Sequence, residues 1–132
     1  MRISNANQIT SEELRDLVVK GMQEKKAQDI VVMDLRNVKN AITDYFVICS
    51  GNSDTQIDAI SGSVEEEVYK AAQVDPWHKE GKLNREWILL DYVDVVVHVF
   101  KKERRTFYDL EQLWGDAEIQ YIEETANSAP IL

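Results

Sequence analysis

Two aspartates lie close enough in the chain to share a metal ion or a proton. Asp91 ends one apolar segment and Asp94 begins the next, so a two-residue turn between them would set their carboxylates opposite each other in a β-hairpin. Paired carboxylates can bind a divalent cation or hold a proton between them. A metal site needs further ligands, and neither His78 nor His98 has recognisable ligand spacing to the pair. We therefore predict no metal, and interpret both as solvated turn carboxylates or as groups that meet a basic partner.

A second candidate is the segment Ser50-Gly51-Asn52-Ser53, which joins a predicted strand to a predicted helix. Backbone amides at a helix N-terminus can bind a phosphate. The segment lacks both the lysine of a P-loop and the three-glycine pattern of a dinucleotide site, so it is predicted to be a capping turn, and no cofactor is expected. The alternative left open is a nucleotidyltransferase-like enzyme, with a triphosphate at Gly51 and magnesium at Asp91 and Asp94.

Aromatic residues and arginines form the third group of candidates, because Trp, Tyr and Arg are enriched among the residues that carry binding energy at protein interfaces. The candidates of these types are Trp87, Tyr92, Arg105, Tyr108 and Trp114. Each could equally close the hydrophobic core. Trp87 and His98 are predicted to be directly opposed across the hairpin, where ordinary packing is the default.

Arg105 belongs to a basic cluster at the start of a predicted third helix, where the helix dipole disfavours positive charge. The cluster could simply be solvated. The sharper reading is an ion pair with Glu111 or with the acidic surface of another chain.

The elements that must position these residues follow from capping and periodicity. Thr10 with Glu13, and Ser53 with Gln56, are capping boxes that start two amphipathic helices. A third helix is expected to end at Gly115. Four strands are expected, two near-continuous apolar runs that indicate central positions in a sheet and two that form the hairpin. The predicted strands cover 29–35, 44–50, 87–90 and 95–100, the third helix is marked by 107–114, and 73–85 is predicted to be a loop.

The hairpin register follows from a turn at Tyr92 and Val93, which pairs Leu89 with Val96. Alternation then puts two sets of residues on opposite faces. Ile88, Leu90, Val95, Val97 and Val99 form the core face, and Trp87, Leu89, Asp91, Asp94, Val96 and His98 form a mixed face typical of an interaction surface.

These elements predict an α/β (α+β) fold with a mixed central sheet of about four to five strands flanked by helices. The expected organisation is an N-terminal tail at 1–10, one domain at 11–117 and an acidic C-terminal extension at 118–132.

The charge balance limits the choice of partner. With 24 acidic and 15 basic residues the chain carries a net charge of −9, which argues against nucleic acid as the main contact and favours a basic protein. Cys49 is the only cysteine and lies in a predicted buried strand, so a reducing compartment, the cytoplasm, is expected. No run approaches the ~18 to 20 apolar residues of a membrane span, and no membrane contact is expected.

Four separated segments resemble the signature segments of the ribosomal silencing factor (RsfS, or Iojap-like) family, in the same order. They are 43–53, 87–92, 94–100 and 105–114. The resemblance implies a fold similar to nucleotidyltransferases without their catalytic carboxylates, a homodimer, and no enzymatic activity. It also implies binding to ribosomal protein fourteen of the large ribosomal subunit. Occupation of that site would exclude the small subunit and lower translation when nutrients are short.

The resemblance also implies site residues, without separating ribosome contacts from dimer contacts. Trp87, Asp91, Tyr92, Asp94, His98, Arg105, Tyr108, Leu110, Glu111, Leu113 and Trp114 fall within the matching segments, as do the turn and cap positions Thr43, Asp44, Ser50, Gly51 and Ser53. One departure is Val93, which stands where the family usually has glycine, although a β-branched residue disfavours the positive φ of a tight turn.

Overall fold

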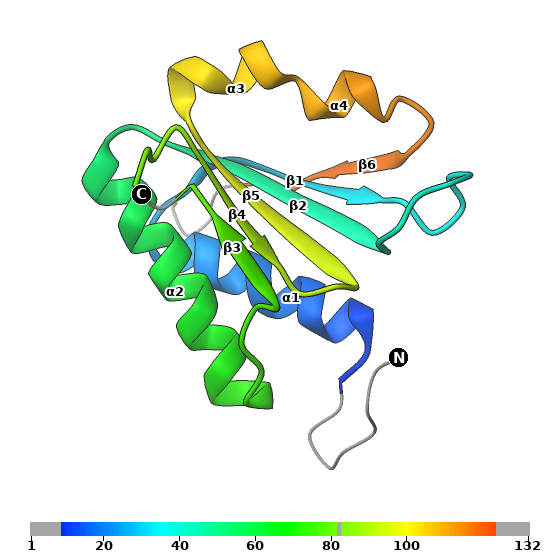
Figure 1. Ribbon diagram of the computed structural model, residues 1–132, viewed down its shortest axis with the longest axis horizontal. Coiled ribbons are helices and arrows are strands. Elements are labelled where there is room, and N and C mark those ends of the chain that lie inside the picture. The colour runs from blue at the N-terminus through cyan, green and yellow to red at the C-terminus, as the bar shows by residue number, and fades with distance from the viewer. Residues whose placement is uncertain (1–8, 82, 124–132) are drawn as a thin grey trace, which may run out of the picture.

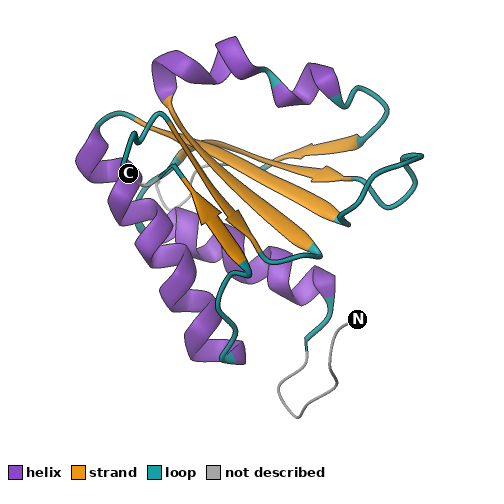
Figure 2. Cartoon of the chain, in the orientation of Figure 1, coloured by secondary structure: helices purple, strands orange, loops and turns teal. Residues whose placement is uncertain are grey.

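The chain folds around one mixed β-sheet. The computed structural model describes residues 9–81 and 83–123, with the side chains of 106–108 left out. The sheet has six strands in the order β3-β4-β5-β2-β1-β6, of which β2 and β5 run parallel and all other neighbours antiparallel (Figures 1 and 2). The strands are β1 (Gln28–Asp34), β2 (Tyr45–Gly51), β3 (His78–Glu80), β4 (Trp87–Asp91), β5 (Val95–Lys101) and β6 (Glu118–Tyr121). The predicted α+β class with a mixed sheet is confirmed, but the predicted four to five strands are too few.

The two unpredicted strands form the edges of the sheet. β3 lies inside the segment 73–85 that was expected to be a loop, and β6 begins the acidic stretch at 118. β3 is three exposed polar residues, and β6 has the single half-buried apolar residue Ile119 among exposed neighbours. Edge strands bury little, so neither carries the apolar run from which a strand is recognised in sequence.

Helices α1 (Ser11–Glu24) and α2 (Asp54–Ala72) begin as predicted. At α1 the capping box is complete, since Thr10 Oγ1 accepts from the Glu13 amide and Glu13 Oε1 accepts from the Thr10 amide, both at 3.0 Å. At α2 Ser53 Oγ accepts from the Gln56 amide at 3.1 Å. The Gln56 side chain returns to the amide of Asn52 at 2.7 Å, one residue before the cap, so this capping box is modified. No helix in the described part of the chain is long and apolar enough to cross a membrane.

The predicted third helix is two short helices. α3 (Lys102–Tyr108) and α4 (Leu110–Leu113) are separated by Asp109, which has φ 44° and ψ 56°. Aspartate tolerates this left-handed conformation better than most residues, which explains why the chain bends there. Gly115 follows the second helix after the cap at Trp114, so the C-terminal boundary is close to the predicted one while the continuous helix was wrong.

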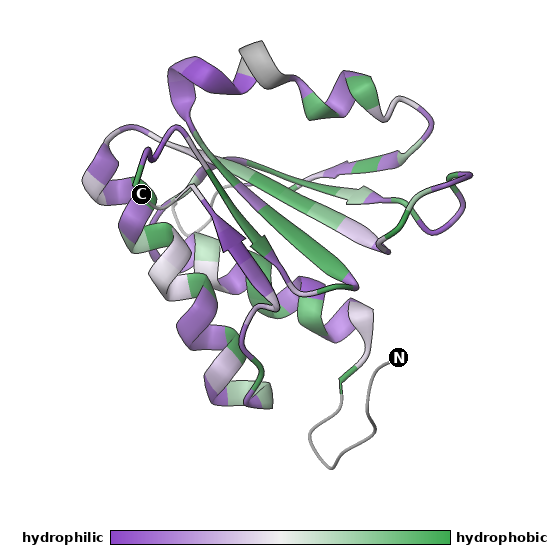
Figure 3. Ribbon diagram, viewed as in Figure 1, coloured by the Kyte–Doolittle hydropathy of each residue, from purple (hydrophilic) through white to green (hydrophobic). Residues whose placement is uncertain are grey.

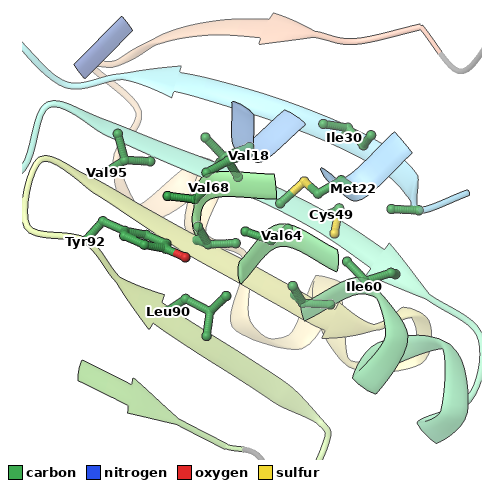
Figure 4. Packing of buried hydrophobic residues seen from close by; sticks show 14 of the residues in the cluster. Val18, Met22, Ile30, Cys49, Ile60, Val64, Val68, Leu90, Tyr92 and Val95 are labelled. Atoms are coloured by element: carbon green, nitrogen blue, oxygen red, sulfur yellow. The ribbon is translucent and has the colours of Figure 1, made fainter. Parts of the chain in front are cut away.

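Both faces of the sheet are covered, one more fully than the other. Figure 1 shows α1 and α2 on one side and α3 with α4 on the other, and Figure 3 shows that the inner strands are largely apolar. Alternate strand residues pack in a large core against α1 and α2, among them Cys49, whose thiol pKa is raised by burial (Figure 4). The remaining residues form a smaller cluster against Leu110 and Trp114. The face of the sheet under α3 and α4 is therefore the one that keeps uncovered apolar surface.

Candidate functional site

The β4–β5 hairpin carries most of the predicted site residues. Its register pairs Asp91 with Val96 and Leu89 with His98, and the loop is Val93 and Asp94. The predicted turn at Tyr92 and Val93 was one residue too early, and the predicted pairs of Asp91 with Asp94, Leu89 with Val96 and Trp87 with His98 are wrong. A partner shift of two residues leaves the side chains of both strands on their predicted faces, because the side-chain period of a strand is two, whereas Asp94 lies in the loop.

The turn itself is strained and closely tied. The amide of Asp94 donates to the carbonyl of Tyr92 at 3.0 Å, which makes Val93, with φ 78°, the central residue of a γ-turn. The Tyr92 amide donates to the Val95 carbonyl at 2.9 Å, and Asp91 Oδ1 accepts from the Val93 amide at 2.8 Å. A backbone in so sparsely populated a region costs roughly 1–3 kcal/mol and persists only where its surroundings enforce it.

Asp91 and Asp94 are not opposed across the hairpin, because Asp91 pairs with Val96 and Asp94 lies in the loop. One Asp91 oxygen accepts from the turn amide of Val93, and the Asp94 carbonyl accepts from the amides of Asp44 at 3.0 Å and Tyr45 at 3.2 Å. Within 9–81 and 83–123, no group of three or more His, Cys, Asp or Glu side chains could hold a metal ion. These aspartates therefore shape the hairpin tip and the loop beside it.

The outward face of the hairpin, together with the adjoining part of β2, forms a partly uncovered and mainly apolar surface, which we call the open face. It consists of Phe46, Trp87, Leu89, Asp91 and Val96, all half-buried, which neighbour one another across β2, β5 and β4. The residues of the same face that lie under α3 and α4 are buried instead. Trp114 packs at the boundary, with its ring 5.9 Å from that of Phe46. The open face is thus the part of this side of the sheet that the short helices cover least.

His98 lies beneath the open face and is hydrogen-bonded to Trp87, one of the residues of that face. The histidine residue is 3% exposed, and Nδ1 accepts a 3.0 Å hydrogen bond from the indole of Trp87. Desolvation lowers the pKa of His98 to about 3, so the ring is neutral at physiological pH and its proton sits on Nε2. That buried Nε2 has no hydrogen-bond partner among the described residues, which costs about 1–3 kcal/mol. His98 therefore orients Trp87 and is not itself exposed to a partner.

Arg105 is engaged within the chain. Its guanidinium donates to the Asp29 carbonyl at 2.5 Å and to the Ser50 hydroxyl at 3.0 Å, and pairs with Glu111 at 2.8 Å. The ion pair with Glu111 was one of the alternatives that the sequence left open. Because Asp29 and Ser50 belong to β1 and β2, Arg105 ties α3 and α4 to the sheet.

The remaining predicted residues are spread between the core and the loops. Tyr92 is buried among the residues of the large core (Figure 4), and burial raises the pKa of its phenol. Thr43 is buried, while Asp44 is half-buried next to the hairpin tip. Gly51 packs against α2, since a Cβ there would lie 3.0 Å from Ile57 Cδ1. The side chain of Tyr108 lies outside the described part of the chain.

Sequence reasoning missed Phe46 as a member of the site. Its ring is 4.6 Å from that of His98 in an edge-to-face contact. The signal was present, because Phe46 lies between Tyr45 and Val47, which face the core, and alternation sends it to the opposite face. What sequence could not supply was the parallel pairing of β2 with β5, which places Phe46 beside Val96.

Comparison with known proteins gives consistent matches. The family model described as "Ribosomal silencing factor during starvation" matches residues 8–130. The chain is similar to ribosomal silencing factor RsfS of Halalkalibacterium halodurans, at 40% identity over 112 residues that cover 83% of this chain and 92% of the relative. It is also similar to RsfS of Bacillus subtilis, at 42% identity over 94 residues, or 71% and 78% of the two chains. The crystal structure of a Chromobacterium violaceum protein matches with a TM-score of 0.76 at 32% identity, covering 81% of this chain and 88% of that one.

These matches decide between the two functions that the sequence left open. A nucleotide-binding enzyme is overturned, because the family model spans most of the chain and describes a silencing factor. The chain belongs to the ribosomal silencing factor family, and is a ribosome-binding regulator of translation that catalyses no reaction.

Proposed function

We propose that this chain binds the large ribosomal subunit through its ribosomal protein fourteen, and that the open face makes the contact. A folded domain at that position would exclude the small subunit by steric obstruction. Translation would then fall under nutrient limitation without any bond being made or broken.

The observation that carries the assignment of the face is its composition. Phe46, Trp87, Leu89 and Val96 are apolar or aromatic and half-buried, and Asp91 lies at their edge. With a net charge of −9, such a surface fits a basic protein better than bare ribosomal RNA. The charge would mainly set the rate of encounter, and the aromatic side chains would set how long the complex lasts.

Among the residues predicted to meet a partner, we assign Trp87, Asp91, Asp94 and Trp114 to the contact itself or to its margin. Tyr92, His98, Arg105 and Glu111 support the contact from within the fold, since all four make their contacts inside the chain. Tyr108 is kept as a candidate contact on the resemblance alone.

Three further parts of the proposal come from the family resemblance. They are a homodimer, action in the cytoplasm, and a distant relation of the fold to nucleotidyltransferases that lacks their catalytic carboxylates. The mixed sheet with two long helices on one face supports the third. Light scattering of the purified chain would test the first, with a mass near twice 15.2 kDa expected.

The function is tested by sucrose-gradient sedimentation of the chain with separated ribosomal subunits. The wild-type chain should travel with the large subunit and reduce the yield of joined ribosomes. A Leu89→Lys, Val96→Lys double variant places two positive charges on the open face and should abolish both effects. The control is Leu83→Lys, because Leu83 is 95% exposed at the opposite end of β4. Joined ribosomes that form normally at saturating wild-type chain would overturn the proposal.

A further inference from the structure

Val93 combines two properties that seldom occur together in a folded chain. Its backbone has φ 78°, a conformation that strongly disfavours a β-branched side chain, and the residue as a whole is 55% exposed. A glycine would adopt the same backbone without strain. The isopropyl group of Val93 thus adds little hydrophobic stabilisation to the fold, while its β-branched shape makes the turn harder to form.

The surrounding hydrogen bonds enforce this geometry. Three of them close the turn, from the amides of Tyr92, Val93 and Asp94. Two more anchor the Asp94 carbonyl to the amides that lead into β2. These five hydrogen bonds hold the tip, with Val93 in the loop between β4 and β5. Strain of this kind is concentrated at positions that bind or switch, where rigidity reduces the entropy lost on association.

We propose that the Val93 side chain is an apolar contact element that a basic protein surface buries on binding, extending the contact beyond the open face. This inference rests on the proposed function, and its partner is the ribosomal protein described there. Three acidic residues, Asp44, Asp91 and Asp94, take part in the hydrogen bonds that close or anchor the turn. A cationic rim around a small apolar pocket is the partner surface that complements this arrangement.

Substitutions at Val93 separate a contact from a purely structural role, because the two make opposite predictions. Val93→Gly removes the strain and the side chain together, so thermal stability should rise while affinity for the large subunit falls about tenfold. Val93→Thr keeps the β-branched shape and the strain but replaces a methyl with a hydroxyl. It should leave stability unchanged and still weaken binding severalfold.

Leu83→Gly is the matched control, because Leu83 is 95% exposed in a loop at the other end of β4 and has no positive φ. It should give no gain in stability and no change in affinity. The measurements are the melting temperature and the titrated co-sedimentation of each variant with purified large subunits.

Several outcomes would overturn the inference. If Val93→Gly binds as well as the wild-type chain, no partner buries the side chain. If Val93→Thr binds normally while Val93→Gly does not, only the turn conformation matters. If Val93→Gly alters self-association and spares subunit binding, the occupant is a second copy. A wild-type chain that binds no large subunit would overturn the proposed function itself, and with it the partner assigned to Val93.

Discussion

The indole of Trp87 donates to Nδ1 of His98 at 3.0 Å, although the two residues are diagonal and not opposite in the hairpin. Trp87 also stacks on its true partner Phe100, with ring centroids 5.0 Å apart. These two contacts fix the indole in one orientation. A half-buried tryptophan that is already oriented loses little conformational entropy when a partner covers it.

Replacing His98 with leucine should separate its effect on the orientation of the Trp87 indole from its effect on the stability of the fold. The substitution removes the acceptor for Trp87 but also removes the unpartnered Nε2–H, so the free energy of unfolding should change by less than ~1 kcal/mol. Binding to large subunits should weaken about three- to tenfold. The indole N–H resonance of Trp87 in a proton–nitrogen NMR spectrum should move toward the position of a solvent-exposed indole. An unmoved resonance would show that the hydrogen bond to His98 does not set the orientation of the ring.

The same histidine should make the fold sensitive to mild acid. Its pKa is about 3 in the folded chain against 6.5 in the unfolded one, so only the unfolded chain takes up a proton between these values. Stability should therefore be fully present above pH 6.5 and decline as the pH falls toward 3. Between pH 7.5 and pH 5 the loss from this group is ~2 kcal/mol. Urea unfolding should show that loss in the wild-type chain and little of it in His98→Leu; equal losses in both would reject this assignment.

Arg105→Ala should loosen the α3–α4 segment. The Arg105 side chain is 13% exposed, and its guanidinium donates to three acceptors. Its loss should lower the free energy of unfolding by ~2–3 kcal/mol and raise amide hydrogen exchange across 102–114. Arg104→Ala is the control, since Arg104 pairs with Glu86 at 3.5 Å in an exposed position and should change stability by less than ~0.5 kcal/mol. Equal effects of the two substitutions would contradict the role of Arg105.

Two glycines in the helices should respond oppositely to alanine. A Cβ at Gly21 of α1 would lie 2.7 Å from Val64 Cα on α2, and the backbone cannot yield without separating the helices. Gly21→Ala should destabilise the fold by ~1–3 kcal/mol. A Cβ at Gly62 of α2 would meet nothing within 4 Å, so Gly62→Ala should stabilise by ~0.5–1 kcal/mol through helix propensity. Thermal unfolding measures both, and a stabilised Gly21→Ala would disprove the close helix contact.

Rules about residues close together in sequence correctly predicted the features that depend only on such residues. The capping box of Thr10 and Glu13 and the alternation of Leu89 with Leu90 needed no knowledge of the tertiary structure, and both are confirmed. The predicted hairpin register was wrong. Turns are predicted from the backbone preferences of their residues, and Val93 violates those preferences with its φ of 78°. The third acceptor of Arg105, the carbonyl of Asp29, lies 76 residues away in sequence, and no local pattern could have identified it.

Strand β6 has a consequence for the behaviour of shortened chains. It pairs along β1 from Asp34 to Val31, so it covers backbone groups of a strand whose Val31, Val32 and Met33 are almost completely buried. A chain cut at residue 117 would leave that apolar strand as an open border, ready to recruit the same border of another molecule. Such a fragment should aggregate during expression, because the four residues of β6 no longer cover this border.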